Sequence, residues 1–346
     1  MDYFLFDFSG VQFHYTMSRI IISKPMKKLL WCFCLLLCCL ECVACGPQQD
    51  KSSDRQNISV NNYNFFGDEQ KVIFKQVPQR ILVCGNSGVE TLVALGAGDK
   101  ITVAVLTEAE DKGRLQALLP NTRIYTQPLQ LEAAVALQPD FILGWRRYFA
   151  DNQLGDTSSW IANGIPAYIQ DASGPVPAKG RFPACTIASE KRFISNMGLA
   201  LGKQQQAQDI IQRIDAELQA VEKIPAQKVL FVEFLNGNIE VFGNDLLCGD
   251  IIRHYGCSLV SYSAPFISQE EMMEMQVAKI FIVYHGGEQQ KQAALAQLHN
   301  PLYKHLPAVA SGQVYPIAYK QIVAPGSDLL GTLKYIKQCL LANHPQ

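Results

Sequence analysis

Two series of short apolar strands, each alternating with helices, dominate the chain after residue 61. In the first series the strands and helices are predicted at 81–84, 89–95, 101–105, 131–137 and 141–143. In the second series they are predicted at 229–232, 246–255, 270–277, 280–284 and 314–317. Short strands that are apolar throughout and alternate with helices are typical of mostly parallel sheets covered on both faces. The pattern therefore predicts two α/β lobes.

A long helical stretch, residues 189–223, separates the two series and is interrupted only by Gly198 and Gly202. Its apolar residues largely follow helical spacing, and they are Ile194, Met197, Leu201, Ile210, Ile211, Ile214, Leu218 and Val221. The predicted fold class is therefore α/β, with two lobes of mostly parallel sheets joined by a single long α-helix. We place the N-terminal lobe at 62–188 and the C-terminal lobe at 224–346.

The charge composition limits the partners of the chain. Its 346 residues include 30 Lys and Arg against 31 Asp and Glu, for a formal net charge of −1, and no run is rich in Lys or Arg. Binding to nucleic-acid phosphates depends on a strongly positive surface, so nothing in the composition favours a nucleic-acid partner. A hydrophobic content of 48% is that of a globular protein with sizeable cores.

The segment 29–50 holds six of the 11 cysteines. Three lysines, Lys24, Lys27 and Lys28, precede an apolar run, and small residues follow it up to Cys45. Basic, apolar and small-residue regions in this order are typical of an export signal, and the run is shorter than the ~20 apolar residues that span a membrane. A zinc site is the alternative, but zinc ligands need folded backbone and polar supporting partners, which an apolar run lacks.

The residues before Cys45 resemble a bacterial lipobox, which implies that Cys45 is the lipid-modified first residue of the mature protein. The pattern departs from the usual one at Cys42, where leucine is common, and at Glu41. We interpret residues 1–45 as a misassigned translation start followed by a lipoprotein signal peptide, with a disordered extension as the alternative for the misassigned part. Residues 46–61 are predicted to be a flexible tether, and a hairpin across Gly67-Asp68 is predicted to follow it.

Three segments together carry a resemblance to a known family, and they are PQRILVCGNSGVETLVALGAGDKI, LEAAVALQPDFIL and LYKHLPAVASGQVYPI. They resemble, in this order, iron-siderophore and cobalamin substrate-binding proteins of ABC importers, over nearly all of residues 62–346. The resemblance implies two rigid lobes, a ligand cleft between them and limited hinge motion. It also implies a monomeric, non-catalytic protein that is anchored outside the cytoplasmic membrane and has no cofactor. Such a protein captures a metal chelate, either a ferric siderophore, cobalamin or haem, and delivers it to an ABC permease and its ATPase.

The resemblance further implies docking on the permease through one glutamate per lobe, and the matching positions are Glu132 and Glu270. Each lobe has such a glutamate at a helix start and an aromatic residue at the end of the next strand. Protruding carboxylates pair with arginines through bidentate hydrogen bonds. The alternative is that both acids merely favour the helix dipole, with Ser268 and Glu271 as a possible capping box. The first site departs from the family in having Gln130 where asparagine commonly opens the helix.

Ligand contacts are predicted at the carboxyl ends of the strands, where open α/β sheets bind ligands. In the first lobe the candidates are Asn86, Ser87, Thr107, Trp145, Arg146, Arg147 and Tyr148. In the second lobe they are Phe234, Phe242, Phe266, Tyr284, His285, Tyr319 and Lys320. A large chelate needs wide apolar faces and a few placed donors. The pair Trp145-Arg146 resembles the cobalamin-binding branch, whereas arginines and tyrosines suit an anionic ferric siderophore equally well.

A bare metal ion is a poor match to the sequence. The six histidines show no paired helical spacing, and a zinc or manganese site would need a denser set of His, Asp and Glu. His285 is interpreted as a structural histidine, with a hydrogen-bond donor or an axial haem ligand as alternatives. For Trp160 and Phe266, simple packing is as good an interpretation as ligand contact. Cys248 and Cys257 either form a disulfide, which an oxidising compartment allows, or are two buried thiols.

An enzyme is the alternative function. The turn Gly85-Asn86-Ser87-Gly88 lies between a strand and a helix, but it matches neither G-x-S-x-G nor G-x-G-x-x-G. A tight turn with a helix cap is therefore the favoured interpretation of Ser87, and no Ser/His/Asp set stands out elsewhere. The alternative hypothesis is an exported α/β reductase or chelatase that acts on a metal chelate.

Overall fold

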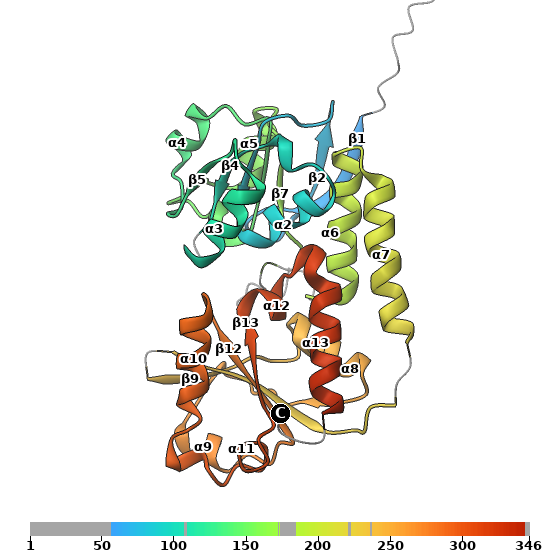
Figure 1. The fold of residues 1–346 in the computed structure, drawn as a ribbon. Helices are drawn as coiled ribbons and strands as arrows, with labels where there is room; N and C mark the ends of the chain where they lie inside the picture. Colours follow the sequence, from blue (N-terminus) through green and yellow to red (C-terminus); the bar gives the residue numbers. More distant parts are fainter. Residues whose placement is uncertain are drawn as a thin grey trace, which may run out of the picture. The chain divides into compact units, whose positions relative to one another are not determined.

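The computed structural model describes residues 57–106, 109–171, 173, 185–220, 223–235 and 237–342. These residues belong to one compact unit, Arg55–Gln346 (Figure 1). The predicted export signal, the lipidation residue Cys45 and the candidate ligand residue Thr107 lie outside the described residues. No helix in the described part of the chain is both long enough and apolar enough to cross a membrane.

The first lobe is built on a five-stranded parallel sheet with the strand order β5-β4-β3-β6-β7. Its strands are β3 (Ile81–Cys84), β4 (Ile101–Val105), β5 (Arg123–Tyr125), β6 (Phe141–Gly144) and β7 (Ala167–Ile169). Its helices are α2 (Asn86–Ala94), α3 (Ala109–Leu118), α4 (Leu131–Ala136) and α5 (Thr157–Ala162). Strands β3 and β6 are buried at every position, which explains their uniformly apolar sequences. From β3 the chain adds β4 and β5 on one side of β3, and then β6 and β7 on the other side. The topological switch point therefore lies between β3 and β6.

A hairpin precedes this sheet, as predicted across Gly67-Asp68. Its strands β1 (Ile58–Tyr63) and β2 (Glu69–Phe74) pair antiparallel. The tether predicted at 46–61 therefore extends too far, because β1 already begins at Ile58. The polar residues of β1 made it resemble a tether in the sequence. The amide of Asn62 is in fact buried and makes two hydrogen bonds with the backbone of Ile169, at 2.8 and 2.9 Å, which tie the hairpin to β7.

The stretch predicted as one long helix forms two helices, α6 (Ile187–Ala200) and α7 (Gln204–Gln219), which lie side by side (Figure 1). The chain turns at Gly202, whose φ of 65° is the left-handed conformation that glycine adopts without strain. Gly198 permits the close approach, because a Cβ there would lie 2.5 Å from the Cβ of Ala207. The single-helix prediction is thus corrected: helical spacing continues on both sides of the turn, and spacing alone does not report a reversal of direction.

The second lobe has a mixed sheet of six strands in the order β11-β9-β8-β12-β13, with β10 beside β8. Its strands are β8 (Lys228–Leu235), β9 (Asn238–Val241), β10 (Ser258–Leu259), β11 (Phe266–Ile267), β12 (Lys279–Tyr284) and β13 (Val314–Ala318). Strands β8, β12 and β13 are parallel, while β9 returns antiparallel to β8 and β11 is antiparallel to β9. The helices are α8 (Leu247–His254), α9 (Gln269–Met273), α10 (Glu288–Gln297), α11 (Pro307–Ala310), α12 (Tyr319–Val323) and α13 (Leu329–Leu341).

The two faces of the second sheet belong to different cores. Along β8, Val229 and Phe231 pack into the core that continues into the first lobe, whereas Leu230 and Val232 belong to a separate core. Successive residues of a strand point to opposite faces of the sheet, so residues two positions apart along β8 share a face. The shared core also contains residues of α6, α7, α8 and α13. The lobes are therefore joined by continuous apolar packing, as well as by the chain between them, and the predicted α/β fold with two lobes is confirmed.

Candidate ligand-binding site

Trp145 lies at the topological switch point of the first sheet, directly after β6. The neighbouring turn after β3 contains Gly85, with a φ of 117°, and a Cβ there would be 3.4 Å from Cδ1 of the indole. The indole Nε1 donates to Oγ of Ser87 at 3.0 Å and to Oε1 of Gln170 at 3.1 Å. Trp145 is 8% exposed. Because its N–H is engaged inside the first lobe, Trp145 offers a ligand its ring and no hydrogen bond.

Two arginines follow Trp145 in the short 3-10 helix η2 (Arg146–Phe149). The guanidinium of Arg147 lies over the Trp145 ring, 5.2 Å from its centroid, and over the Tyr148 ring at 5.0 Å. Arg146 lies over the ring of Phe65 at 5.0 Å, and burial lowers the pKa of Arg146. An arginine remains charged under all ordinary conditions. This edge of the first lobe is therefore both aromatic and cationic.

Tyr319 begins α12 and contacts aromatic residues of both lobes. Its ring centroid lies 4.4 Å from that of His285, with the two rings stacked at an angle of 28°, 5.9 Å from that of Phe242 and 6.4 Å from that of Trp145. Burial raises the pKa of the Tyr319 hydroxyl. We call Trp145, Phe242, His285 and Tyr319 the aromatic cluster. Four residues predicted from separate strand ends are thus brought together. His285 and Tyr319 follow the parallel strands β12 and β13, which end at the same edge of the second sheet, whereas Phe242 follows the antiparallel β9 and Trp145 comes from the first lobe.

A pair of carboxylates lies next to this cluster on the second lobe. Glu233 on β8 and Glu240 on β9 are directly opposite in the antiparallel register, and Glu233 is 6% exposed. Nε2 of His285 lies 3.4 Å from Oε2 of Glu233. Burial, and then the charge of Glu233, raise the pKa of Glu240. Like charges directly opposite in a sheet are destabilising. This part of the β8–β9 pair is therefore suited to a cation or a hydrogen-bond donor.

These two carboxylates were missed by the sequence prediction. Acids in a strand read as solvent-facing residues, and the only signal was their symmetric spacing about the turn in FVEFLNGNIEVF. The structure also places opposite charges about Tyr319: Glu240 and Glu233 raise the pKa of its hydroxyl, while Arg147 lowers it. Positive charge from the first lobe and negative charge from the second therefore act on one side chain.

The remaining ligand candidates take different places. Ser87 and Tyr148 are fully buried, and their hydroxyl oxygens accept hydrogen bonds from Trp145 and Arg147 respectively. Both residues therefore hold side chains of the site in place. Phe266 is 52% exposed and pairs in register with Glu240. Ligand contact by these residues stays a prediction.

Three further candidates lie at element ends. Asn86 is buried where α2 begins, and Tyr284 ends β12 beside Ala318. The ring of Phe234 lies 5.6 Å from that of Tyr303 and packs against the separate core of the second lobe. Phe234 therefore lies on the face of the sheet that is remote from the aromatic cluster.

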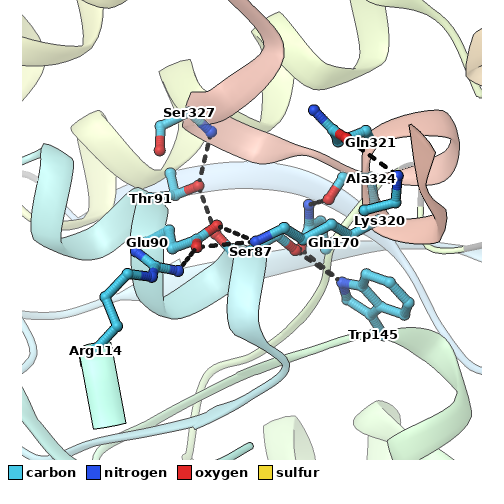
Figure 2. A network of polar contacts seen from close by, with 11 residues as sticks. Ser87, Glu90, Thr91, Arg114, Trp145, Gln170, Lys320, Gln321, Ala324 and Ser327 are labelled. Carbon is cyan, nitrogen blue, oxygen red and sulfur yellow. Dashed lines mark hydrogen bonds and ion pairs between the residues drawn. The ribbon is translucent and has the colours of Figure 1, made fainter. Parts of the chain in front are cut away.

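Lys320 turns away from the aromatic cluster and pairs with Glu90 of α2, at 3.0 Å. Glu90 also pairs with Arg114 of α3 (Figure 2). A cavity of about 480 Å³ lies beside them, lined by Glu90, Arg114, Lys320, Ser327 and Asp328. Lys320 was predicted to bind ligand, but in this structure its ammonium group forms an ion pair with a carboxylate of the first lobe.

Several other polar contacts join the same stretch of the second lobe to the first. We call residues 320–328 the junction segment. Nε2 of Gln170 donates to the carbonyl of Ala324 at 3.2 Å, and the backbone N–H of Ser327 donates to Oγ1 of Thr91 at 3.0 Å (Figure 2). The backbone N–H of Gly326 donates to Oε2 of Glu190 at 2.5 Å. Main-chain atoms of the junction segment therefore contact buried side chains of the first lobe and of α6.

Glu190 is fully buried in this junction. Its pKa is raised to about 8, mainly by burial and also by the nearby carboxylate of Asp171, while the hydrogen bonds from Gly326 and Gln170 oppose the shift. The Glu190 carboxyl group is therefore largely protonated at neutral pH. Sequence reasoning did not single it out, because a glutamate in the first turn of a helix is ordinary at an exposed position.

The two predicted docking glutamates are both exposed, in the first turns of α4 and α9. The capping box weighed as an alternative is present, but it uses Glu271, whose Oε2 accepts from Ser268 N at 2.7 Å. Glu270 is therefore not needed for the cap. Exposed apolar side chains accompany both acids, namely Leu131 and Val135 on α4 and Met273 on α9.

Two predictions concern a disulfide and a metal site. Cys248 and Cys257 are both free and buried, so no disulfide joins them, and burial raises the pKa of each thiol. Among the described residues, no group of three or more His, Cys, Asp or Glu is placed to hold a metal ion.

Comparison with known protein families identifies the class. A family model described as periplasmic binding protein matches residues 81–319, which is more than half of the chain. The chain therefore belongs to the periplasmic binding protein family, as predicted. Membership of this family implies an extracytoplasmic location. No curated protein sequence matches the chain.

Solved structures show the same fold. A periplasmic binding protein from Veillonella parvula DSM 2008 is 20% identical, with a TM-score of 0.72, over 83% of this chain and 92% of that chain. A petrobactin-binding protein from Bacillus subtilis is 17% identical, with a TM-score of 0.62, over 83% and 100%. A periplasmic haem-binding protein from Roseiflexus sp. RS-1 is 16% identical, with a TM-score of 0.57, over 76% and 97%. The family and these neighbours are binding proteins, not enzymes.

Proposed function

We propose that this chain captures a metal chelate at the aromatic cluster and delivers it to an ABC permease. The observation that carries the proposal is the approach of Trp145 and Tyr319, from different lobes, to 6.4 Å at the switch point of the first sheet. Open α/β sheets bind ligands at this point, and aromatic faces bury a large flat or apolar ligand well. The similarity to petrobactin-binding and haem-binding proteins supports a ferric siderophore or haem.

The charges around the cluster refine this class of ligand. Arg147 favours an anionic group next to Trp145, while Glu233 and Glu240 favour a cationic or hydrogen-bond-donating group on the other side. A chelate that carries only negative charge satisfies the first lobe and is opposed by the second. The preferred ligand therefore has an anionic part and a donor-bearing part, and cobalamin, which the sequence left open, is retained as a test compound.

Tryptophan fluorescence tests the proposal directly. Trp160 offers a matched control, because it is also buried but donates its N–H to the carbonyl of Leu154, away from the cluster. We expect at least one of ferric petrobactin, a ferric trihydroxamate, haem or cobalamin to quench the emission with saturable affinity. Quenching should be largely lost in Trp145→Phe and kept in Trp160→Phe. Saturable binding of none of these compounds would overturn the proposal, and chemical change of a recovered chelate would favour an enzyme.

Glu132 and Glu270 are proposed to dock on the permease. Their exposure and apolar neighbours suit a surface on which carboxylates meet arginines. We expect the double variant Glu132→Ala/Glu270→Ala to bind chelate normally and to lose uptake in cells. Glu271→Gln is the matched control, since its carboxylate serves the helix cap, and it should retain uptake. Full uptake by the double variant would contradict the docking assignment.

Lipid anchoring through Cys45 is proposed from the sequence alone. Intact-mass measurement of the membrane-bound chain should show a diacylglyceryl-type mass increase on a chain that starts at Cys45. Cys45→Ser should release the chain from the membrane, while Cys42→Ser should not. Membrane release by Cys42→Ser alone would move the anchor to that residue.

A further inference from the structure

Gln170 lies where the first lobe, Trp145 and the junction segment meet. It directly follows β7, and its backbone N–H donates to the carbonyl of Gly144 at 2.9 Å, which places it beside the residue before Trp145. Gln170 is 1% exposed. A buried amide must have its hydrogen bonds made inside the protein, so its partners show what it does.

The amide of Gln170 has partners on three different elements (Figure 2). Oε1 accepts from Oγ of Ser87 at 3.0 Å and from Nε1 of Trp145 at 3.1 Å, while Nε2 donates to the carbonyl of Ala324 at 3.2 Å. The indole N–H only donates and the carbonyl only accepts. The opposite orientation of the amide would therefore place two donors together at Trp145 and two acceptors together at Ala324, and the network permits one orientation only.

These contacts connect the two halves of the aromatic cluster by a second route. Trp145 is held at its N–H edge by Gln170, and Tyr319 begins the helix whose C-terminal cap is Ala324. The backbone N–H of Ala324 donates to the carbonyl of Lys320 at 3.0 Å, so the position of Ala324 follows that of α12. Both residues are therefore linked to the same amide group, Trp145 directly and Tyr319 through the backbone of α12.

We propose that Gln170 is a positioning residue for ligand binding, which holds the Trp145 ring in its binding orientation and links it to the junction segment. The identity of the ligand in this inference rests on the proposed function. The orientation of the Trp145 ring by Gln170 does not depend on any ligand. Ligand contact with Trp145 is thereby coupled to the contact between the lobes. The two hydrogen bonds to Ser87 and Trp145 lie within the first lobe, and the bond to Ala324 reaches the second.

The two parts of this role are separable by substitution. Gln170→Met keeps the shape of the side chain and removes these three hydrogen bonds, together with the hydrogen bond to Glu190. Gln170→Glu keeps acceptor oxygens for Ser87 and Trp145, and at a pH high enough to ionise this buried carboxyl it has no proton to donate to Ala324. Gln313→Met is the matched control, because Gln313 is also a buried glutamine but bonds to Lys279 and Tyr315, in the second lobe only.

The first measurement needs no chelate. In a Trp31→Phe/Trp160→Phe background Trp145 is the single tryptophan of the chain, and acrylamide quenching reports its exposure. We expect Gln170→Met to raise the quenching constant about threefold or more, with Gln170→Glu and Gln313→Met close to the parent. Unchanged quenching in Gln170→Met would overturn the proposal, as would an equal rise in Gln170→Met and Gln170→Glu.

The second measurement uses haem and a ferric trihydroxamate as probes. For whichever probe the parent binds, we expect Gln170→Met to lower the affinity about tenfold or more, because the Trp145 ring is then no longer held in its binding orientation. Gln170→Glu should lie between it and the parent. Parent affinity in Gln170→Met would overturn the ligand half of the proposal. Failure of the parent to bind any chelate would instead overturn the proposed function, and acrylamide quenching would still decide the role of Gln170.

If Gln170→Met does not fold, Gln170→Glu and Ser87→Ala decide the question. Ser87→Ala removes one of the two acceptors of the indole N–H and leaves the bond to Ala324 in place. The proposal then requires a small rise in Trp145 quenching in Ser87→Ala, and reduced probe affinity without increased quenching in Gln170→Glu. The reverse pattern would overturn it.

Discussion

The aromatic cluster and the junction segment both join the lobes, but they do so with different chemistry. The cluster joins Trp145 to Tyr319, Phe242 and His285 by ring contacts at 4.4 to 6.4 Å, which have little directional character. The junction segment is held by directional hydrogen bonds, and three of its contacts use its own main-chain atoms. Ring contacts can separate to admit a ligand at modest cost, whereas buried main-chain bonds are costly to leave unmade. The cluster is therefore suited to adapt to a ligand, and the junction segment is suited to hold the lobes rigidly together.

The largest expected effect is at Gly326, the tightest point of the junction. Its φ is 59°, and a Cβ there would lie 2.3 Å from Oγ1 of Thr91. Gly326→Ala therefore combines left-handed strain, about 1–2 kcal/mol, with overpacking, about 1–3 kcal/mol. We expect urea unfolding to show a loss of about 2–5 kcal/mol in the free energy of unfolding.

Gly256→Ala is the matched control for this prediction. Gly256 has a φ of 72°, but a Cβ there would meet no atom within 4 Å. It should lose about 1 kcal/mol, from backbone strain alone. Equal losses in the two variants would show that the junction is less tightly packed than the structure indicates.

The next effect is the pH dependence contributed by Glu190. Its folded-state pKa of about 8 lies above the ordinary value of 4.5, so the folded chain keeps a proton that the unfolded chain loses. The resulting stability is complete below about pH 4.5 and is lost as the pH rises to about 8. The groups that face this carboxyl are Asp171, the Gln170 amide and the Gly326 N–H.

Glu190→Gln removes this titration while keeping the side-chain shape. We expect the stability of the wild type, relative to Glu190→Gln, to fall by about 1 kcal/mol per pH unit between pH 5 and 8. Unfolding in urea at four pH values measures it. A constant difference across that range would mean that Glu190 does not hold its proton in the folded state.

A smaller effect is expected from the ion pair of Lys320 and Glu90. Both side chains are largely buried, so a double-mutant cycle with Lys320→Met and Glu90→Gln should give a coupling of about 1 kcal/mol. Glu90→Gln should cost more than Lys320→Met, because Arg114 continues to pair with Glu90 when Lys320 is absent.

The exposed pair of Lys291 and Glu288, three residues apart on α10, is the control cycle. Its coupling should be close to the limit of measurement. If the coupling between Lys320 and Glu90 were as weak as that of the surface pair, their ion pair would contribute nothing to the rigidity of the junction.

The smallest effect concerns the charge preference of the cluster. We expect a ferric trihydroxamate that ends in a primary amine to bind roughly threefold more tightly than its N-acetylated form, since an amine pairs with Glu233 and Glu240. Glu240→Gln should reduce this preference, and Glu69→Gln, on the distant hairpin, should leave it unchanged. Tighter binding of the acetylated form in fluorescence titrations would contradict the assigned role of the carboxylates.

Much of the architecture was predictable because its determinants are local. The uniformly apolar run of Ile81–Cys84 indicates a strand covered on both faces, and the strand-end rule brought Trp145 and Tyr319 to one site. The turn at Gly202 was not predictable in the same way, because helical spacing continues on both sides of it. The junction residues Gln170 and Glu190 were also missed, as was Glu233 beside the aromatic cluster, since all three resemble ordinary surface residues in sequence.

The sequence by itself thus determined the two α/β lobes, the family and the aromatic residues at the strand ends. Hydrophobic periodicity and strand direction act over a few residues, and both are visible in the order of amino acids. Only the tertiary structure decided that Lys320 pairs with Glu90, that Gln170 meets the carbonyl of Ala324, and that Glu190 is buried against Gly326. These contacts join residues more than 130 positions apart, and buried polar groups acquire their partners only when the lobes pack together.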